Sequence, residues 1–248
     1  MSRAAAMPRV RSFQTASRTH VGLSRSLNED RFLARPEVGL WAVADGMGGH
    51  QAGDVASLRV VDALTNVGRF GSGYAYLNAV REGLVAANGD LIAHAATLSP
   101  GAVIGSTVAV LLAHEDHYAC VWAGDSRIYL LRGGALMRVT RDHSLMQELI
   151  DTGALDEQEA RNRRISNVIT RAVGAAAKLE LSETHGDIRP GDLFLLCSDG
   201  LTGLVEDHEL GAMLAQDDLE VIADQLLALT LERGARDNVT LMLVRARR

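Results

Sequence analysis

Short apolar segments of strand length recur along this chain of 248 residues, and they limit its fold more than any other feature. Several are β-branched, and glycine, aspartate or charged turns bound them, as is typical of β-strands. The segments are Leu40–Ala44, Thr107–Ala113, Tyr118–Ala123, Ile128–Leu131, Leu193–Cys197 and Val239–Val244. The polar residues 114–117 lie between two of these segments and predict a hairpin turn.

Helical periodicity marks other stretches of the chain. An apolar stripe predicts long helices over Ala52–Val67, Tyr76–Ala96 and Leu219–Glu232. Shorter helices are predicted at Leu145–Thr152, Asp156–Arg161 and Glu206–Ala215. Because groups of strands are followed by separate helices and do not alternate with them, the pattern predicts an α+β fold with antiparallel sheets.

The chain has no internal repeat, low-complexity block or linker rich in proline and glycine, which favours one domain spanning residues 19–248. Residues 1–18 are predicted to be a flexible tail. Residues 144–174 are richer in charge and predict a helical insertion on the main body. Cys120 and Cys197 lie inside apolar runs, so both are expected to be buried thiols of a cytoplasmic protein, with no disulfide between them.

Composition and missing motifs exclude several classes of function. The net charge of −6 argues against general nucleic-acid binding. No apolar run approaches the ~20 residues that a membrane-spanning helix needs. Lys178 is the only lysine and lies in no nucleotide-binding, kinase or Schiff-base motif. The chain also lacks the Gly-x-Ser-x-Gly, His-Glu-x-x-His and Cys-x-x-Cys patterns.

Acidic residues recur beside glycine or asparagine near the ends of the strands. The set consists of Asp45-Gly46, Asp125 and Asp199-Gly200 after apolar segments, Asp237-Asn238 before the last segment, and Asn28-Glu29-Asp30 before the first. Any one of them is most simply a turn. Together at one end of a sheet, however, carboxylates repel each other and need cations to offset that repulsion. The set therefore predicts a site for divalent cations.

The acidic residues belong to an ordered series of motifs. The series is Arg25-Ser-Leu-Asn28-Glu29-Asp30, Asp45-Gly-Met-Gly-Gly-His50, Gly105-Ser-Thr107, Gly124-Asp125-Ser126-Arg127, Asp142-His143-Ser144, Ser198-Asp199-Gly200 and Arg236-Asp237-Asn238. It resembles that of metal-dependent protein phosphatases of the type 2C class, from about Thr19 to Arg245. The resemblance implies a four-layer α-β-β-α sandwich of two antiparallel sheets flanked by antiparallel helices, with a small helical flap at residues 144–174.

The same resemblance implies metal ligands. Asp45 would bridge two Mn²⁺ or Mg²⁺ ions, and the Gly46 carbonyl would bind one of them. Asp199 and Asp237 would bind the other ion, and Asp125 would help to hold a weaker third. Two ions lower the pKa of a shared water, so hydroxide that attacks phosphorus in line is available near neutral pH.

The resemblance also implies roles around the ions. Arg25 would grip the substrate phosphate, because a guanidinium suits bidentate bonding to phosphate. Glu29, Asp30 and Asn238 would act through water or by supporting the ligands. Hydrolysis by this route needs no covalent intermediate. Arg25, which would bind the phosphate, and Asp45, which would bridge the ions, are the expected catalytic residues of a protein-serine/threonine phosphatase.

Two positions depart from the pattern of the family. Some members carry a histidine, as a general acid, two residues after the bridging aspartate, where this chain has Met47. His50 is a candidate for that acid; the alternatives are that His50 is a structural histidine or that a water supplies the proton. Members also place an acid four residues after the Asp199 equivalent, where this chain has Gly203, which weakens the expectation of a third ion.

A narrower resemblance concerns the partners. Ala34-Arg-Pro and Asn167-Val-Ile-Thr-Arg-Ala-Val-Gly174 are similar to segments of phosphatases that accompany type VI secretion kinases in bacteria. It implies that the phosphorylated substrate is a kinase or a forkhead-associated protein. The enzyme is expected to act on phosphoserine or phosphothreonine proteins and to be a monomer. Two alternatives remain open: a catalytically silent relative that binds phosphoproteins, and a two-metal hydrolase of small phosphate esters.

Overall fold

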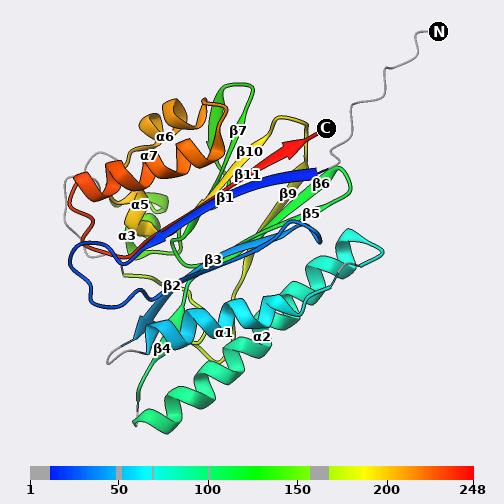
Figure 1. Cartoon of the computed structure of the whole chain (residues 1–248). Helices are drawn as coiled ribbons and strands as arrows, with labels where there is room; N and C mark the ends of the chain where they lie inside the picture. The colour runs from blue at the N-terminus through cyan, green and yellow to red at the C-terminus, as the bar shows by residue number, and fades with distance from the viewer. Residues whose placement is uncertain (1–11, 49–51, 69, 100, 157–167) are drawn as a thin grey trace.

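Two antiparallel sheets lie face to face, and helices cover both outer faces (Figure 1). The computed structural model describes residues 12–48, 52–68, 70–99, 101–156 and 168–248. This arrangement is the predicted α-β-β-α sandwich.

The first sheet has the strand order β1-β11-β10-β7-β8. Its strands are β1 (Ser12–His20), β7 (Arg127–Arg132), β8 (Ala135–Arg138), β10 (Leu193–Cys197) and β11 (Val239–Arg247). The helices α5 (Asp199–Thr202), α6 (Asp207–Leu214) and α7 (Leu219–Glu232) lie on its outer side (Figure 1). Asp218 caps α7 by accepting hydrogen bonds from the Glu220 and Val221 amides.

The second sheet has the order β2-β3-β5-β6-β9, and β4 pairs with β3 alone. Its strands are β2 (Asp30–Arg35), β3 (Leu40–Gly48), β4 (Ile104–Ser106), β5 (Val108–His114), β6 (His117–Ala123) and β9 (Ser182–Asp187). The helices α1 (Gly53–Thr65) and α2 (Gly73–Leu98) cover its outer face (Figure 1).

Alternation along the strands builds three apolar layers. In β3, Leu40 and Ala42 face α1 and α2, whereas Trp41 and Val43 face the other sheet. In β11, Leu241 faces α7 in the same way. Because both faces of these central strands are buried, their sequences are continuous apolar runs, which is why they could be recognised from the sequence.

The four edge strands β1, β2, β8 and β9 escaped prediction, as did the short strand β4. Residues 12–18, assigned above to a flexible tail, form most of β1, which pairs with β11 from Ser12 to His20. β9 has alternating exposed and half-buried residues at the edge of the second sheet. An edge strand needs only one buried face, so apolar runs do not mark it.

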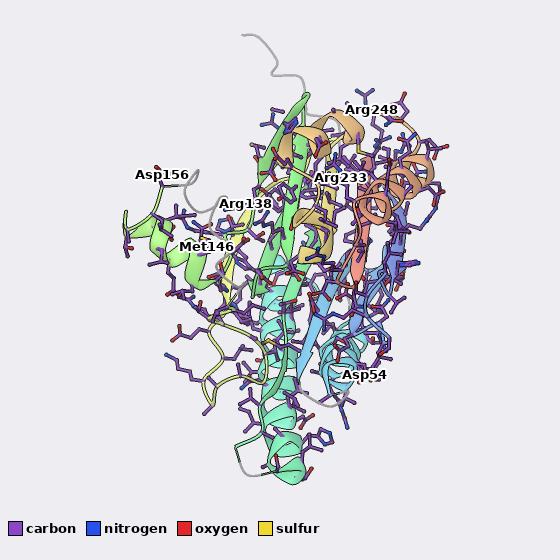
Figure 2. All side chains as sticks on the ribbon, turned by 90° about the vertical axis from the view of Figure 1, so that its left-hand side faces the viewer. Asp54, Arg138, Met146, Asp156, Arg233 and Arg248 are labelled. Atoms are coloured by element: carbon purple, nitrogen blue, oxygen red, sulfur yellow. The ribbon has the colours of Figure 1, made fainter. Side chains whose placement is uncertain are left out.

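The longer helices agree with their predicted ranges to within three residues at either end, and α7 agrees at both ends. Of the expected flap at 144–174, the structure describes residues 144–156 and 168–174. The first of these ranges includes α3 (Leu145–Asp151), which Ser144 caps by accepting a hydrogen bond from the Gln147 amide. Figure 2 shows α3, with Met146, projecting from one side of the sandwich. The predicted helix at 156–161 lies outside the described residues, apart from Asp156.

Cys120 and Cys197 are both buried and free, as expected. Each packs in an apolar cluster of buried residues, so its thiol serves as a small apolar group. In the part of the chain that the structure describes, no helix has the length and apolarity needed to cross a membrane.

Candidate metal centre and active site

Asp30 and Asp45 face each other at one end of the second sheet. They are register partners across the β2–β3 ladder, so their side chains lie on the same face of the sheet. Asp45 lies within β3 and does not follow it, contrary to the sequence interpretation, because β3 continues to Gly48 by pairing with β4. Asp125 follows β6 of the same sheet.

The first sheet brings two more aspartates to this end. Asp199 follows β10 and opens α5, and Asp237 lies two residues before β11. The link between the sheets is Ser198, whose hydroxyl donates to Asp30 Oδ2 at 2.8 Å. The Ser198 hydroxyl also accepts from the Thr240 amide at 3.0 Å. The five predicted aspartates therefore converge from both sheets.

Their electrostatics are those of a crowded carboxylate cluster. Desolvation, followed by the charges of Asp30, Asp199, Asp125 and Asp237, holds the pKa of Asp45 well above its ordinary value. Desolvation also raises the pKa of Asp30 to about 7, against the hydrogen bonds from Thr240 and Ser198. Desolvation likewise raises the pKa of Asp125 to about 7, and the charge of Asp199 is the next largest cause. Cations would relieve this repulsion.

Two further observations fit a hard cation. Among the described residues, Asp30 Oδ1 is the buried side-chain oxygen without a hydrogen-bond partner. A Cβ on Gly53 would lie within 3.0 Å of both Glu29 Oε1 and the Gly46 carbonyl oxygen, so these two oxygens share one space. Carboxylate and carbonyl oxygens are the donors that Mg²⁺ and Mn²⁺ prefer.

No three His, Cys, Asp or Glu side chains in the described residues have, by themselves, the spacing of a metal site. The case for cations therefore rests on the mutual repulsion of the aspartates and on the unpartnered oxygen of Asp30. Both observations follow from the burial of the carboxylates. Neither requires that the side chains already surround an ion.

Arg25 and Asn238 complete the site. Arg25 Nη2 lies 2.8 Å from Asp237 Oδ2, and half of the arginine side chain is exposed, so its other donors face solvent. Asn238 Oδ1 accepts from the Glu29 amide at 2.8 Å, and its Nδ2 donates to the Val21 and Leu27 carbonyls. Asn238 thus fixes the loop that carries Arg25 and Glu29 to the start of β11.

Two hydroxyls that received no role in the sequence interpretation connect the aspartates. Thr107 Oγ1 accepts from the Asp45 amide at 3.0 Å and lies 2.7 Å from Ser126 Oγ. Asp45 and the loop of Asp125 are therefore joined through buried side chains. Both residues lie within the quoted motifs, but only their contacts reveal what they do.

The comparisons with known proteins agree with this geometry. The sequence model of the family described as Protein phosphatase 2C matches residues 4–239. The chain belongs to the protein phosphatase 2C family.

Several bacterial members of the family are similar along most of this chain. Serine/threonine protein phosphatase PstP of Mycobacterium tuberculosis is 36% identical over 229 residues, which are 92% of this chain and 44% of PstP. The chain thus spans less than half of the length of that relative. Serine/threonine phosphatase Stp of Listeria monocytogenes is 33% identical over 237 residues, 92% of this chain and 93% of Stp.

Solved structures of the family have the same fold. PppA, described as a key regulatory component of T6SS in Pseudomonas aeruginosa, superposes with a TM-score of 0.89 at 44% identity, covering 96% of this chain and 100% of PppA. The catalytic domain of PstP in complex with two manganese ions gives a TM-score of 0.85 at 35% identity, covering 96% and 99%. The expected sandwich is therefore confirmed.

The two departures from the family pattern lie near the aspartates. Met47 is a half-buried residue of β3, and its Cε lies 3.3 Å from the Cβ position of Gly105. The Gly203 amide donates to the Asp199 carbonyl at 2.7 Å and closes the turn of α5. His50, an alternative for the general acid, lies outside the described residues.

His143, in the Asp-His-Ser motif of this family member, connects the Asp125 loop to the start of α3. Its amide donates to the Gly124 carbonyl at 2.9 Å, and its Nδ1 accepts from the Gly124 amide at 3.2 Å. Its Nε2 lies 2.9 Å from Ser182 Oγ, and the ring stacks on Trp122. Because Nδ1 accepts a hydrogen bond, the ring is neutral, and burial lowers its pKa to about 4.

This lowered pKa predicts a loss of stability in mild acid. Between the ordinary pKa of 6.5 and the folded value of about 4, the unfolded chain binds a proton that the folded chain does not, so stability falls as the pH drops. We expect His143 to account for about 1 kcal/mol of the stability lost between pH 7 and pH 5. Urea unfolding of the wild type and of His143→Asn at both pH values measures this; equal losses in the two proteins would contradict it.

Proposed function

We propose that this chain is a metal-dependent serine/threonine protein phosphatase that hydrolyses phosphomonoesters with two Mn²⁺ or Mg²⁺ ions. The observation that carries the proposal is the convergence of five aspartates from both sheets, with raised pKa values at Asp30, Asp45 and Asp125, beside the half-exposed Arg25. Membership in the family and the two manganese ions of the similar PstP catalytic domain support it.

The ion ligands follow the sequence interpretation. Asp45, the Gly46 carbonyl, Asp199 and Asp237 would hold two ions, and Asp125 would help to hold a weaker third. When bound, such ions offset the carboxylate charge, polarise phosphoryl oxygens and lower the pKa of water. These ligands stand on two sheets that the Ser198–Asp30 hydrogen bond joins, so the packing of the sandwich sets their spacing.

The other residues of the site bind and position. Arg25 would bind the substrate phosphate through the donors that face solvent, while its contact with Asp237 orients the guanidinium. Glu29 and Asp30 would act through water. Asn238 would hold the loop of Arg25 in place through its three hydrogen bonds to that loop's backbone. None of these roles requires a covalent intermediate.

The substrates are proposed to be phosphoserine or phosphothreonine proteins, including a bacterial serine/threonine kinase or its forkhead-associated partner. The similarity to PppA, a regulatory component of a type VI secretion system, supports that setting. Buried free thiols at Cys120 and Cys197 support the cytoplasm as the compartment. We also propose that the enzyme acts as a monomer.

The test is hydrolysis of p-nitrophenyl phosphate and of a phosphothreonine peptide with Mn²⁺, with Mg²⁺ and with EDTA. We expect phosphate release from the peptide with either ion and none with EDTA, because the carboxylates need divalent charge to act on phosphate. Turnover of the small ester alone would favour a hydrolase of small phosphate esters. No turnover with any ion would favour the catalytically silent relative.

A further inference from the structure

A surface pocket of about 550 Å³ lies beside the proposed metal site, and two arginines line it. The guanidinium of Arg233 is already bonded within the protein, because it donates to Glu209 Oε1 at 2.6 Å and to the Leu204 carbonyl at 2.7 Å. Arg236 is exposed, and its guanidinium makes no hydrogen bond or ion pair with any residue that the structure describes. The pocket therefore contains one cation that is available to a ligand.

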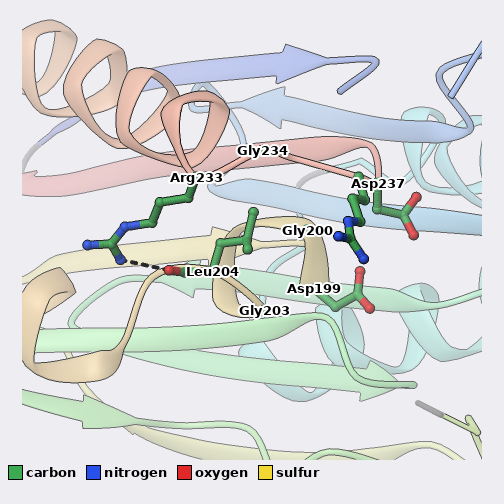
Figure 3. Close-up of a pocket in the computed structure, with 8 residues that line it drawn as sticks. Asp199, Gly200, Gly203, Leu204, Arg233, Gly234 and Asp237 are labelled. Carbon is green, nitrogen blue, oxygen red and sulfur yellow. Dashed lines mark hydrogen bonds between the residues drawn. The ribbon is translucent and has the colours of Figure 1, made fainter. Parts of the chain in front are cut away.

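The pocket stays open because glycines form much of its wall. Gly200, Gly203 and Gly234 line it together with Leu204, Arg233, Arg236 and the two aspartates. A Cβ on Gly234 would meet nothing within 4 Å, so this part of the wall faces open space. Figure 3 shows Arg233 at one end of the pocket and Asp199 and Asp237 at the other. The volume is large enough for an amino-acid side chain of a substrate.

The charges around the pocket favour an anion there once the site is loaded. Asp237 is already paired with Arg25 at 2.8 Å. Asp199 would be offset by the proposed ions. Arg236 is then the charge that a substrate side chain in the pocket meets. Since Asp199 and Asp237 line both the pocket and the proposed metal site, that side chain must lie next to the phosphorylated residue in the substrate.

We propose that Arg236 binds an acidic side chain adjacent to the phosphorylated residue, which makes it a specificity-determining residue of this enzyme. The assignment rests on the proposed phosphatase function and adds the class of substrate. A guanidinium that has no partner among the described residues gives up no contact with them when it binds a carboxylate, so the interaction favours acidic over neutral peptides.

The test compares two phosphothreonine peptides that differ only in a glutamate or a glutamine beside the phosphothreonine. We expect the wild type to have the higher kcat/KM for the glutamate peptide. Arg236→Ala should lower the ratio of the two kcat/KM values about fivefold, mainly through KM, and Arg236→Lys should keep most of the ratio. Raising the salt concentration should weaken the wild-type preference, because the pair is exposed.

Arg189→Ala is the matched control, because Arg189 is also exposed but lies in the β9–β10 turn, and it should leave the ratio unchanged. Equal losses on both peptides, or a wild type without preference, would overturn the role of Arg236. If the wild type hydrolysed neither peptide with any ion, the proposed function would fail. Fluorescence anisotropy with the same two peptides would then test the role of Arg236 separately. Weaker binding of the glutamate peptide to Arg236→Ala than to the wild type would support that role, and equal binding would contradict it.

Discussion

Asp199→Asn is expected to lower kcat/KM for a phosphothreonine peptide by about a thousandfold, which corresponds to ~4 kcal/mol of transition-state stabilisation. The proposed role of this carboxylate is to hold a metal ion, and an amide of the same shape is a much weaker ligand for a hard cation. The measurement is steady-state hydrolysis with saturating Mn²⁺.

The same substitution should leave the fold intact. The charge of Asp199 raises the pKa values of Asp30, Asp45 and Asp125, so removing it relieves repulsion among the remaining carboxylates. Thermal melting in EDTA should give a Tm equal to or above that of the wild type. Asp90→Asn, an exposed acid on α2, is the matched control and should retain wild-type turnover. A variant that melts far below the wild type in EDTA would show that Asp199 has a structural role instead.

Gly200→Ala should destabilise the protein by about 3 kcal/mol. A Cβ at this position of α5 would lie under 3.0 Å from the Asn238 carbonyl oxygen, a separation that real Cβ atoms essentially never show. The atom it meets belongs to the backbone at the start of β11, so relief requires moving Asn238, which holds the loop of Arg25 and Glu29. We therefore expect activity to fall together with stability.

Gly89→Ala is the matched control, because Gly89 is also helical but a Cβ there meets nothing within 4 Å. Alanine in the exposed interior of α2 should raise stability by about 0.5–1 kcal/mol. Urea unfolding without added metal measures both variants. If the two alanines changed the free energy of unfolding by the same amount, the contact between Gly200 and Asn238 would not be the cause.

The local sequence determined the elements that carry strong apolar patterns. α7 and β10 lie where their patterns predict them. The apolar stripe of a helix and the apolar run of a strand buried on both faces are both patterns of neighbouring residues, so they can be recognised locally. The aspartates at the strand ends were also identifiable, because an isolated turn does not explain their repetition along the chain. Their convergence then followed from the family resemblance and the expected sheets.

Only the tertiary structure decided how distant segments meet. β1 and β9 are polar edge strands, whose stability comes from a neighbouring strand and not from their own composition. The Ser198–Asp30 hydrogen bond joins residues 168 positions apart, and the bonds of His143 to Gly124 join a second distant pair. The pairing of Arg233 with Glu209, which leaves Arg236 as the available arginine of the pocket, is likewise a contact between separate elements. Contacts of this kind depend on packing across layers, which no local pattern encodes.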